Sequence, residues 1–250
     1  MDDTGARPPG PGPGAGDRPT ADQLVDDYYR RNYEAVHGAG CLGGAASVMH
    51  KRLERDRSGR SFPLTVEVGA GRFEHYPFVT HARDRYVATD IRVPTDNAVY
   101  RSLVAGTGPE DLEFRQSDAM ALDFEDSSVD RVVATCLLIH LPDPYGAMHE
   151  WQRVCRPDGV IDVLVPCDPG IVSRAFRRGV SQRVARKQGV PAEEYALVNA
   201  IEHLSPFNRV LKLVRAAVEP GRRLEVDYFP FAKVPSWNLN AFAIMRIDPA

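Results

Sequence analysis

The 250 residues of this chain can bury the core of one domain with an inserted segment, and a net charge of −3 gives no overall field that would recruit nucleic acid or an anionic membrane. Four cysteines without C-x-x-C spacing, at positions 41, 136, 155 and 167, argue against structural zinc and a disulfide framework, so no metal and a reduced, cytoplasmic setting are expected. No apolar run approaches twenty residues and no apolar segment opens the sequence, so neither a membrane span nor export is expected.

The first part of the chain predicts a tail followed by two helices. Pro and Gly dominate residues 1–19, which have almost nothing apolar to bury and are expected to be disordered. Thr20-Ala-Asp-Gln23 is a capping-box pattern that begins a helix, and Gly38 would end it. A second helix is predicted from about Ala45 to Arg57. Residues 20–60 therefore form a helical N-terminal segment.

A short apolar strand, Leu64 to Val68, leads into two glycines spaced Gly-x-Gly. The run Gly69-Ala70-Gly71 lets the chain turn sharply at the carboxyl end of a parallel strand and brings bare main chain close to a ligand. A dinucleotide fold would have a third glycine at Glu74, whose charge would instead meet the pyrophosphate. The acid two residues before the first glycine, Glu67, favours a cationic or amine-bearing ligand.

Four more strands are predicted to follow in the central part of the chain. Val87 to Asp90 ends in an acid about twenty residues after the glycines, where a carboxylate can bind both hydroxyls of a ribose. Gln116 to Ala119 ends a third strand, Arg131 to Cys136 is a fourth, and Val160 to Val165 is a fifth. Helices alternate with these strands, which predicts a doubly wound α/β core over residues 61–167.

The alternation breaks after the fifth strand. Residues 168–206 are helical in pattern but too long for a crossover, and they are predicted to form a basic lid inserted over the site. Residues 207–250 then supply an amphipathic helix, Phe207 to Val218, and two strands, Arg222 to Phe231 and Asn240 to Ile247, which complete the sheet.

From about Leu64 to Pro166, the order and spacing of these motifs resemble the class I S-adenosylmethionine-dependent methyltransferases, in particular the branch that acts on small molecules. The resemblance implies S-adenosyl-L-methionine as the cofactor. It also implies a mostly parallel seven-stranded sheet with an antiparallel last strand, a helical N-terminal segment and a helical insertion after strand five. The cofactor-binding residues that it implies are Glu67, Gly69, Ala70, Gly71, Asp90, Ile91, Asp118, Ala119, Met120, Thr135 and Cys136.

The resemblance also assigns roles within this site. Glu67 would order the loop and help to bind the ammonium end of the methionine, Asp90 would hold the ribose, and Asp118 with the Ala119 N–H would meet the adenine. Phe73 stands where the family often has a third glycine, which would narrow the loop. The alternatives are an ordinary tight turn at the glycines and an acid that caps a following helix at Asp90.

Three further positions have competing interpretations. Met120 would lie on the adenine face or belong to the ordinary core. Cys136 ends strand four and is expected to be a packed residue rather than a nucleophile, because nothing nearby in sequence would stabilise a thiolate. Asp143-Pro-Tyr145 is similar to a signature of enzymes that methylate nucleic-acid bases, but it lies too far beyond strand four, so we interpret it as an N-cap followed by proline.

His140 is the first candidate for a catalytic base, because it lies on the loop that faces the methyl group in this fold and can take a proton at neutral pH. The alternative is a histidine that bonds to backbone at a helix entry. Glu202-His203 would bring a second histidine, His203, over the pocket. Since the sulfonium is already an activated donor, positioning should supply most of the acceleration, up to ~7–11 kcal/mol, and a base only about 10²–10⁴-fold.

The predicted lid carries six cations and no acid between Ile171 and Val190. They would reach a phosphate or carboxylate of the substrate, or form a solvated helix face. The predicted substrate-binding residues are Tyr28, Tyr29, Arg174, Arg177 and Arg178. The lid and the segment from Phe229 to Asn240 also resemble methyltransferase-like proteins of bacterial sugar and surface-polysaccharide biosynthesis, which implies a sugar or a nucleotide-linked sugar as acceptor.

The sequence therefore predicts methyl transfer from S-adenosylmethionine to a small-molecule acceptor, with nucleic acid and membranes excluded as partners. The alternative is a protein of the same fold that binds the cofactor without methylating, as a regulator or for another reaction.

Overall fold

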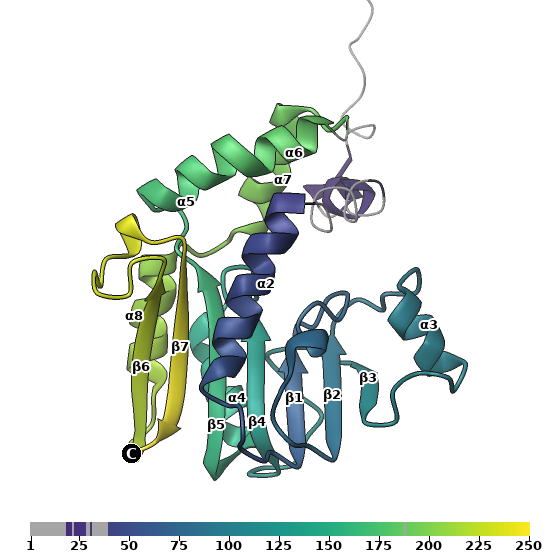
Figure 1. The fold of residues 1–250 in the computed structure, drawn as a ribbon, viewed down its shortest axis with the longest axis vertical. Coiled ribbons are helices and arrows are strands. Elements are labelled where there is room, and N and C mark those ends of the chain that lie inside the picture. The colour runs from purple at the N-terminus through teal and green to yellow at the C-terminus, as the bar shows by residue number, and fades with distance from the viewer. Residues whose placement is uncertain (1–18, 22, 29–30, 32–39, 188) are drawn as a thin grey trace, which may run out of the picture.

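The computed structural model describes residues 19–21, 23–28, 31, 40–187 and 189–250. Seven strands in these residues form one sheet in the order β3-β2-β1-β4-β5-β7-β6 (Figure 1). They are β1 (Leu64–Val68), β2 (Arg85–Asp90), β3 (Leu112–Gln116), β4 (Val129–Thr135), β5 (Cys155–Pro166), β6 (Arg222–Phe229) and β7 (Phe242–Pro249). Strand β7 runs antiparallel to both of its neighbours, β5 and β6, and all other neighbouring strands are parallel. This arrangement confirms the predicted fold class.

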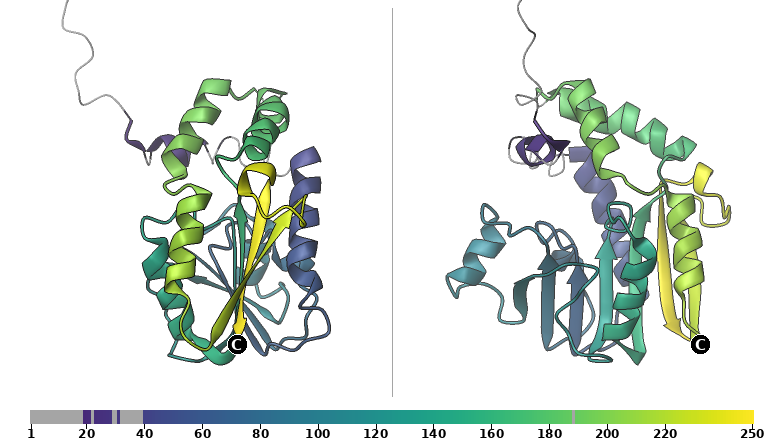
Figure 2. Two further views of the ribbon diagram at one scale, coloured as in Figure 1. Left: turned by 90° about the vertical axis from the view of Figure 1, so that its left-hand side faces the viewer. Right: turned by 180° about the vertical axis from the view of Figure 1, so that it is seen from behind.

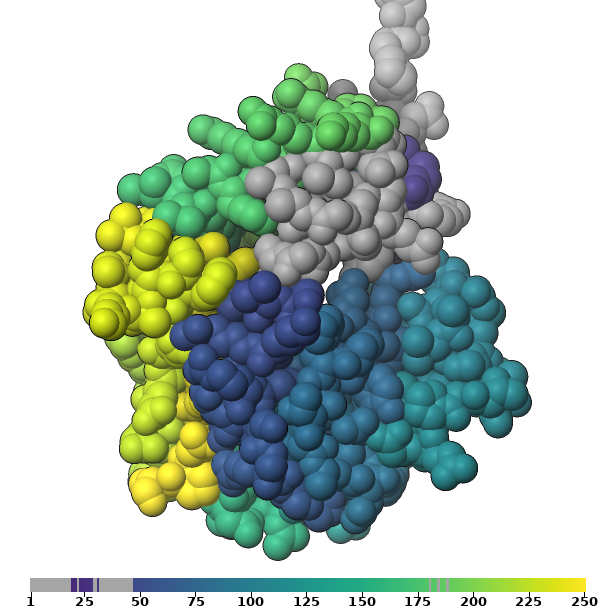
Figure 3. Space-filling view, in the orientation of Figure 1, coloured from purple at the N-terminus to yellow at the C-terminus, as the bar shows by residue number. Residues whose placement is uncertain are grey.

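Helices cover both faces of the sheet and one of its edges. Helix α2 (Gly40–Arg55) lies across the face turned to the viewer in Figures 1 and 3, and α4 (Pro144–Val154) and α8 (Phe207–Ala217) lie side by side on the other face (Figure 2). The remaining helices are α3 (Ala98–Val104), α5 (Ile171–Phe176), the π-helix η2 (Arg177–Ser181), α6 (Gln182–Lys187) and α7 (Ala192–Glu202), with single 3₁₀ turns η1 (Tyr76–Phe78) and η3 (Trp237–Leu239).

Helices α5, α6 and α7, which lie in the chain between β5 and α8, are placed beyond the carboxyl ends of the parallel strands (Figure 1). Within the described residues, no helix is both long and apolar enough to cross a bilayer.

Local sequence signals explain where these elements begin. The capping box is confirmed, because the Thr20 N–H donates to Gln23 Oε1 (2.8 Å) and the Gln23 N–H donates to Thr20 Oγ1 (3.2 Å). Asp143 is the N-cap of α4, where its Oδ1 accepts from the main-chain N–H groups of residues 145 and 146, so the N-cap interpretation is also confirmed. The apolar stripe of α8, including Phe207, Val210 and Val214, is fully buried against the sheet.

Two features differ from the sequence-based expectation. Helix α2 begins at Gly40, five residues before the predicted start. No regular α-helix joins β1 to β2, because this connection holds only the turn η1 and α2 packs beside it. Alternation of strands and helices therefore fails at this crossover, and it fails again between β3 and β4, where residues 117–128 hold no helix. Residues 1–18 and Gly38 lie outside the described residues, so the predicted tail and helix end stay predictions.

A buried network of charged and imidazole groups joins α2 to the sheet. Glu54 on α2 binds His75 Nε2 (3.0 Å), His81 Nδ1 (3.3 Å) and Arg131 Nη2 on β4 (2.7 Å). Arg131 Nε also donates to Asp162 on β5 (2.8 Å). Since all five groups are almost completely buried, each charge must be compensated within the network.

The histidines of this region are held neutral. His50 on α2 places Nδ1 2.9 Å from His75 Nδ1 and stacks on Phe78. Burial, and after it the neighbouring His75, lowers the pKa of His50 to about 3. Burial also lowers the pKa values of His75 and His81, although Glu54 acts in the opposite direction on both.

Candidate functional site

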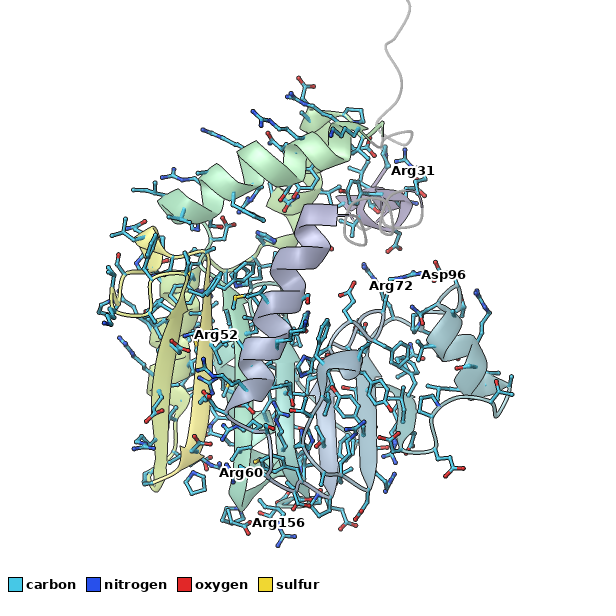
Figure 4. The ribbon with its side chains drawn as sticks, viewed as in Figure 1. Arg31, Arg52, Arg60, Arg72, Asp96 and Arg156 are labelled. Atoms are coloured by element: carbon cyan, nitrogen blue, oxygen red, sulfur yellow. The ribbon has the colours of Figure 1, made fainter. Side chains whose placement is uncertain are left out.

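The candidate site lies at the carboxyl edge of the sheet, where the strand order reverses between β1 and β4. A ligand in an open α/β sheet binds in the crevice at such a reversal. The glycine loop follows β1 at this point, with φ values of +69° at Gly69 and +54° at Gly71, both in the left-handed region that glycine favours. Beside the loop, Arg72 pairs with Asp96 at 2.8 Å, across the gap to the segment before α3 (Figure 4).

Glu67 is completely buried under the glycine loop. Its Oε2 accepts a hydrogen bond from the Tyr86 hydroxyl (2.8 Å), and its Oε1 has no hydrogen-bond partner among the described residues. Burial raises the pKa of Glu67 to about 8, against the lowering effect of the Tyr86 hydrogen bond and with a further rise from Glu74 and Asp90. This carboxyl group is therefore mostly protonated at neutral pH and has one oxygen to offer.

Asp90 fixes the shape of the loop from the end of β2. Its Oδ2 accepts from the Gly71 N–H (2.9 Å) and its Oδ1 accepts from the Arg92 N–H (2.9 Å). The Ala70 N–H donates to the Thr89 carbonyl (2.8 Å). Two of the amides assigned to a ligand are thus used inside the protein, while each Asp90 oxygen keeps a second lone pair. The next helix, α3, begins only at Ala98 and has Asn97 as its N-cap, so the helix-cap alternative for Asp90 is wrong.

Phe73 occupies the third-glycine position with φ at +65°, a conformation that a non-glycine residue seldom adopts. Its side chain is 2% exposed and meets the Phe114 ring edge-on, with centroids 5.9 Å apart. The loop therefore keeps the left-handed backbone of a glycine here, and burial of the phenyl ring holds it in place. The ring points into the core rather than across the loop.

The ends of β3 and β4 complete the edge. Asp118 is exposed and accepts from the Met120 N–H (2.9 Å), while the Ala119 carbonyl accepts from Trp151 Nε1 on α4 (2.8 Å). Met120 packs partly buried against the main core, and Ile91 is 63% exposed. These residues form the side of the crevice nearest β2 and β3.

The loop after β4 packs against the glycine loop, with Leu137 next to Gly69. Thr135 ends the strand, and Cys136 follows with φ at +60°. Burial raises the pKa of Cys136 to about 12, which is consistent with the expectation of a packed, unreactive thiol. Leu137 lies so close to Gly69 that a Cβ there would be 2.7 Å from its methyl carbons, so only glycine fits.

Both candidate histidines meet at the base of the lid. The rings of His140 and His203 lie edge to face, with centroids 5.2 Å apart. His140 Nδ1 is 3.1 Å from the Glu202 carbonyl oxygen, which is the backbone bond that the alternative interpretation expected. His203 Nδ1 is 3.0 Å from Asp168 Oδ2, and Arg177 pairs with the same carboxylate. Sequence reasoning missed Asp168, because Asp168-Pro-Gly170 has the composition of an ordinary turn.

The proposed substrate residues fall in different places. Arg177 lines the pocket beside Asp168, whereas Arg174 and Arg178 are exposed on the lid. Tyr28 is 2% exposed and packs with Tyr195 and other apolar residues of the lid, so it joins the N-terminal segment to the lid. Tyr29 lies outside the described residues. Within those residues, no group of three or more potential ligands is arranged to hold a metal.

The crevice fits an adenosyl amino acid by two observations. Glu67 Oε1 has no hydrogen-bond partner among the described residues, and once the carboxyl group is ionised it could accept from an ammonium group. Gly69 and Gly71 also expose main chain that carries no Cβ, although Leu137 fills the space that a Cβ of Gly69 would take. Asp90 and Asp118 add carboxylates at the adjacent strand ends, as expected for hydroxyl and amino groups.

Comparison with known proteins identifies the central segment. Residues 66–162 match the family model for a methyltransferase domain, Methyltransf_11. Phosphatidylethanolamine N-methyltransferase of Cereibacter sphaeroides is 36% identical over 101 residues, which are 40% of this chain and 48% of that protein. An uncharacterised methyltransferase of Mycolicibacterium paratuberculosis is 27% identical over 181 residues, 68% of this chain and 69% of that one. The chain thus spans about half of one relative and somewhat over two thirds of the other.

Solved structures share the whole fold at low sequence identity. A methyltransferase of Thermotoga maritima aligns over 90% of this chain and 99% of its own, with a TM-score of 0.55 and 12% identity. The cyclase SpnF aligns over 92% and 97%, with a TM-score of 0.59 and 16% identity. A methyltransferase of Aquifex aeolicus gives 92% and 100%, with 0.50 and 15%. At these identities the likeness is one of fold.

Proposed function

We propose that this chain, which carries a class I S-adenosylmethionine-dependent methyltransferase domain, transfers the methyl group of that cofactor to a small metabolite. The domain match and the strand order confirm the family and the cofactor predicted from the sequence. The acceptor, the site residues and the division into lid and core remain proposals.

One juxtaposition carries the proposal. The glycine loop with its buried Glu67 lies at the strand-order reversal. A pocket lined by His203, whose ring meets that of His140, opens on the carboxyl side of the neighbouring strands β4 and β5. A donor site and an acceptor site therefore share one edge of the sheet. The bound cofactor would supply a sulfonium methyl group, which is already activated for transfer.

The chain's own residues would mainly orient the reactants. Glu67 and the glycine loop would bind the methionine end, Asp90 the ribose, and Asp118 with Ala119 the adenine. The lid would exclude water from the reaction. His140, on the loop after β4, is the general base proposed from the sequence, and its neighbour His203 is the second candidate.

The acceptor is proposed to be a sugar or a nucleotide-linked sugar. Arg174 and Arg178 support this, because both are exposed on the lid and neither has an ion-pair partner among the described residues. They would meet phosphate groups of such an acceptor. Arg177 has a different position, since Asp168 already neutralises it.

A second candidate function keeps the cofactor and drops methyl transfer. The fold likeness to the cyclase SpnF favours its consideration, since this architecture also occurs in a protein named for another reaction. Both candidates need the same crevice, so only a labelled product separates them.

The test uses the full chain with radiolabelled S-adenosylmethionine and a panel of sugars, sugar phosphates and nucleotide sugars. Calorimetry with S-adenosylhomocysteine measures cofactor binding separately. We expect Asp90→Asn to weaken this binding by at least tenfold and Asp84→Asn, an exposed acid before the same strand, to leave it unchanged. No binding of S-adenosylhomocysteine would refute both candidates, and binding without any labelled product would favour the second.

A further inference from the structure

A pocket of about 260 Å³ lies at the base of the lid, between the segments that follow β4 and β5 and helix α7. Its polar walls come from Asp168, Arg177, Asn199, His203 and Ser205, and Ile139 is among its apolar walls. This pocket differs from the cofactor crevice, since none of its lining residues belongs to the glycine loop or to the strand ends β1 to β3.

Asp168 fixes the tautomer of His203. Burial by itself would raise the pKa of Asp168, but the hydrogen bond from His203 and the charge of Arg177 hold it below the usual range, so the carboxylate is ionised. An ionised carboxylate can only accept, and therefore His203 Nδ1, 3.0 Å away, carries the hydrogen. The lone pair of the ring is then on Nε2, and an imidazolium formed there would be stabilised by the carboxylate.

His140 has a different position. Its Nδ1 is 3.1 Å from the main-chain carbonyl oxygen of Glu202. Of the two neighbouring rings, His203 is the one that lines the pocket, and its Nδ1 faces the Asp168 carboxylate.

A second observation points to a ligand in the pocket. Ser205 is 1% exposed, and its hydroxyl has no hydrogen-bond partner within the described part of the chain. The Ser205 N–H donates to the Ile139 carbonyl (3.0 Å), which fixes the residue at the pocket wall. A buried hydroxyl without a partner costs about 1–3 kcal/mol, so a polar group of a ligand is expected to complete it.

The charges of the pocket cancel. Arg177 and Asp168 neutralise each other, and the remaining polar walls are an amide, a hydroxyl and the imidazole of His203. Near this group lie also His140 and Glu202, whose carboxylate acts electrostatically on Tyr28. A pocket without net charge does not offset the desolvation of a phosphate or an ammonium, whereas it suits a hydroxyl.

We propose that His203, positioned by Asp168, accepts the proton of an acceptor hydroxyl whose uncharged sugar part is bound in this pocket beside Ser205, while any phosphate of the acceptor lies outside the pocket, toward Arg174 and Arg178. The inference rests on the proposed function. The acceptor oxygen forms a bond to the methyl carbon, the carbon–sulfur bond breaks with its electron pair left on sulfur, and the hydroxyl proton passes to His203 Nε2. Asp168 is a positioning residue, because it acts only through the imidazole.

An NMR measurement of the tautomers of ¹⁵N-labelled histidines in the full chain tests the pair without an acceptor. We expect His203 to carry its hydrogen on Nδ1, and Asp168→Ala to remove this preference. The signals of His149, a partly exposed histidine on α4, should not change in the same variant. A hydrogen on Nε2 of His203, or an Nδ1 preference that persists in Asp168→Ala, would refute the pairing.

Acceptor class is tested with S-adenosylhomocysteine bound, by adding methyl glycosides and, separately, inorganic phosphate. We expect the glycosides to shift the His203 signal and Ser205→Ala to weaken that shift. Inorganic phosphate, which has no sugar hydroxyl, should not shift it. A shift of this signal by inorganic phosphate, or no effect of any glycoside up to its solubility limit, would overturn the acceptor class.

Turnover gives the last arm, with any acceptor that is methylated. His203→Gln should lower kcat by about 10²–10⁴-fold, and His149→Gln should leave kcat unchanged. An unchanged kcat in His203→Gln would overturn this inference, while leaving the proposed function intact. If the unmodified chain does not bind S-adenosylhomocysteine, the proposed function itself is refuted.

Discussion

Cofactor binding should release a proton from Glu67. This carboxyl group is completely buried, burial raises its pKa to about 8, and its Oε1 has no partner among the described residues. An ammonium group placed against that oxygen would favour the ionised form, so the pKa of Glu67 should fall in the complex. A group whose pKa falls on binding makes binding tighter as the pH rises toward its value in the free protein.

The size of the effect follows from that pKa. At pH 7 about nine-tenths of the Glu67 carboxyl groups of the free protein are protonated, and close to one proton per site should be released on binding. If the complex holds the ionised form, the binding constant rises about tenfold between pH 6 and pH 7, which is about 1.4 kcal/mol. The α-amino group of the ligand, with a pKa near ~8, stays charged over this range.

Titration calorimetry with S-adenosylmethionine at pH 6.0 and 7.0 measures both quantities, since the heat in two buffers of different ionisation enthalpy gives the number of protons released. Glu67→Gln imitates the protonated form and should bind with little pH dependence. Asp84→Asn, an exposed acid before β2 that is not among the groups acting on Glu67, should retain the dependence. Binding of equal strength at both pH values, with no proton release, would show that Glu67 stays neutral in the complex and only supports the loop.

Three further outcomes follow from the structure. Gly69→Ala should destabilise the protein by about 1–2 kcal/mol in urea unfolding and weaken S-adenosylhomocysteine binding, because φ at this position is left-handed and the added Cβ would lie 2.7 Å from the methyl carbons of Leu137. Adding Leu137→Ala should restore the space but should not relieve the backbone strain. Acidification should destabilise the fold, because His50 takes up a proton below pH ~6.5 in the unfolded chain but only near pH 3 in the folded protein. The free energy of unfolding should therefore fall by about 2 kcal/mol between pH 7 and pH 5. Unfolding curves at pH 7 and 5 check this, and His50→Leu should reduce the difference. Cys136, with its pKa raised to about 12, should resist iodoacetamide at pH 8 in peptide mapping; rapid labelling would contradict the packed thiol.

Local signals made much of the fold predictable from the sequence. The strand before the glycines has the predicted bounds, Leu64 to Val68, because a short apolar run ended by Gly-x-Gly has few other conformations. The N-cap at Asp143 and the apolar stripe of α8 depend on neighbours three or four residues away. The missing helix between β1 and β2 could not be seen in this way, because α2, from an earlier part of the chain, packs beside that crossover.

Contacts between distant positions escaped sequence reasoning for the same reason. Glu54 and Arg131 are 77 positions apart and each resembles an ordinary surface residue, yet together they form a buried ion pair. His140 and His203 were recognised separately as candidate bases, but what distinguishes them chemically is a carboxylate 35 residues before the second. Asp168 has the sequence context of a turn, and its ionised, buried state depends on Arg177 and His203 arriving from the lid. The orientation and tautomer of His203 are therefore set by the folded lid, and a change that displaces the lid should alter that tautomer even when every residue of the pocket is retained.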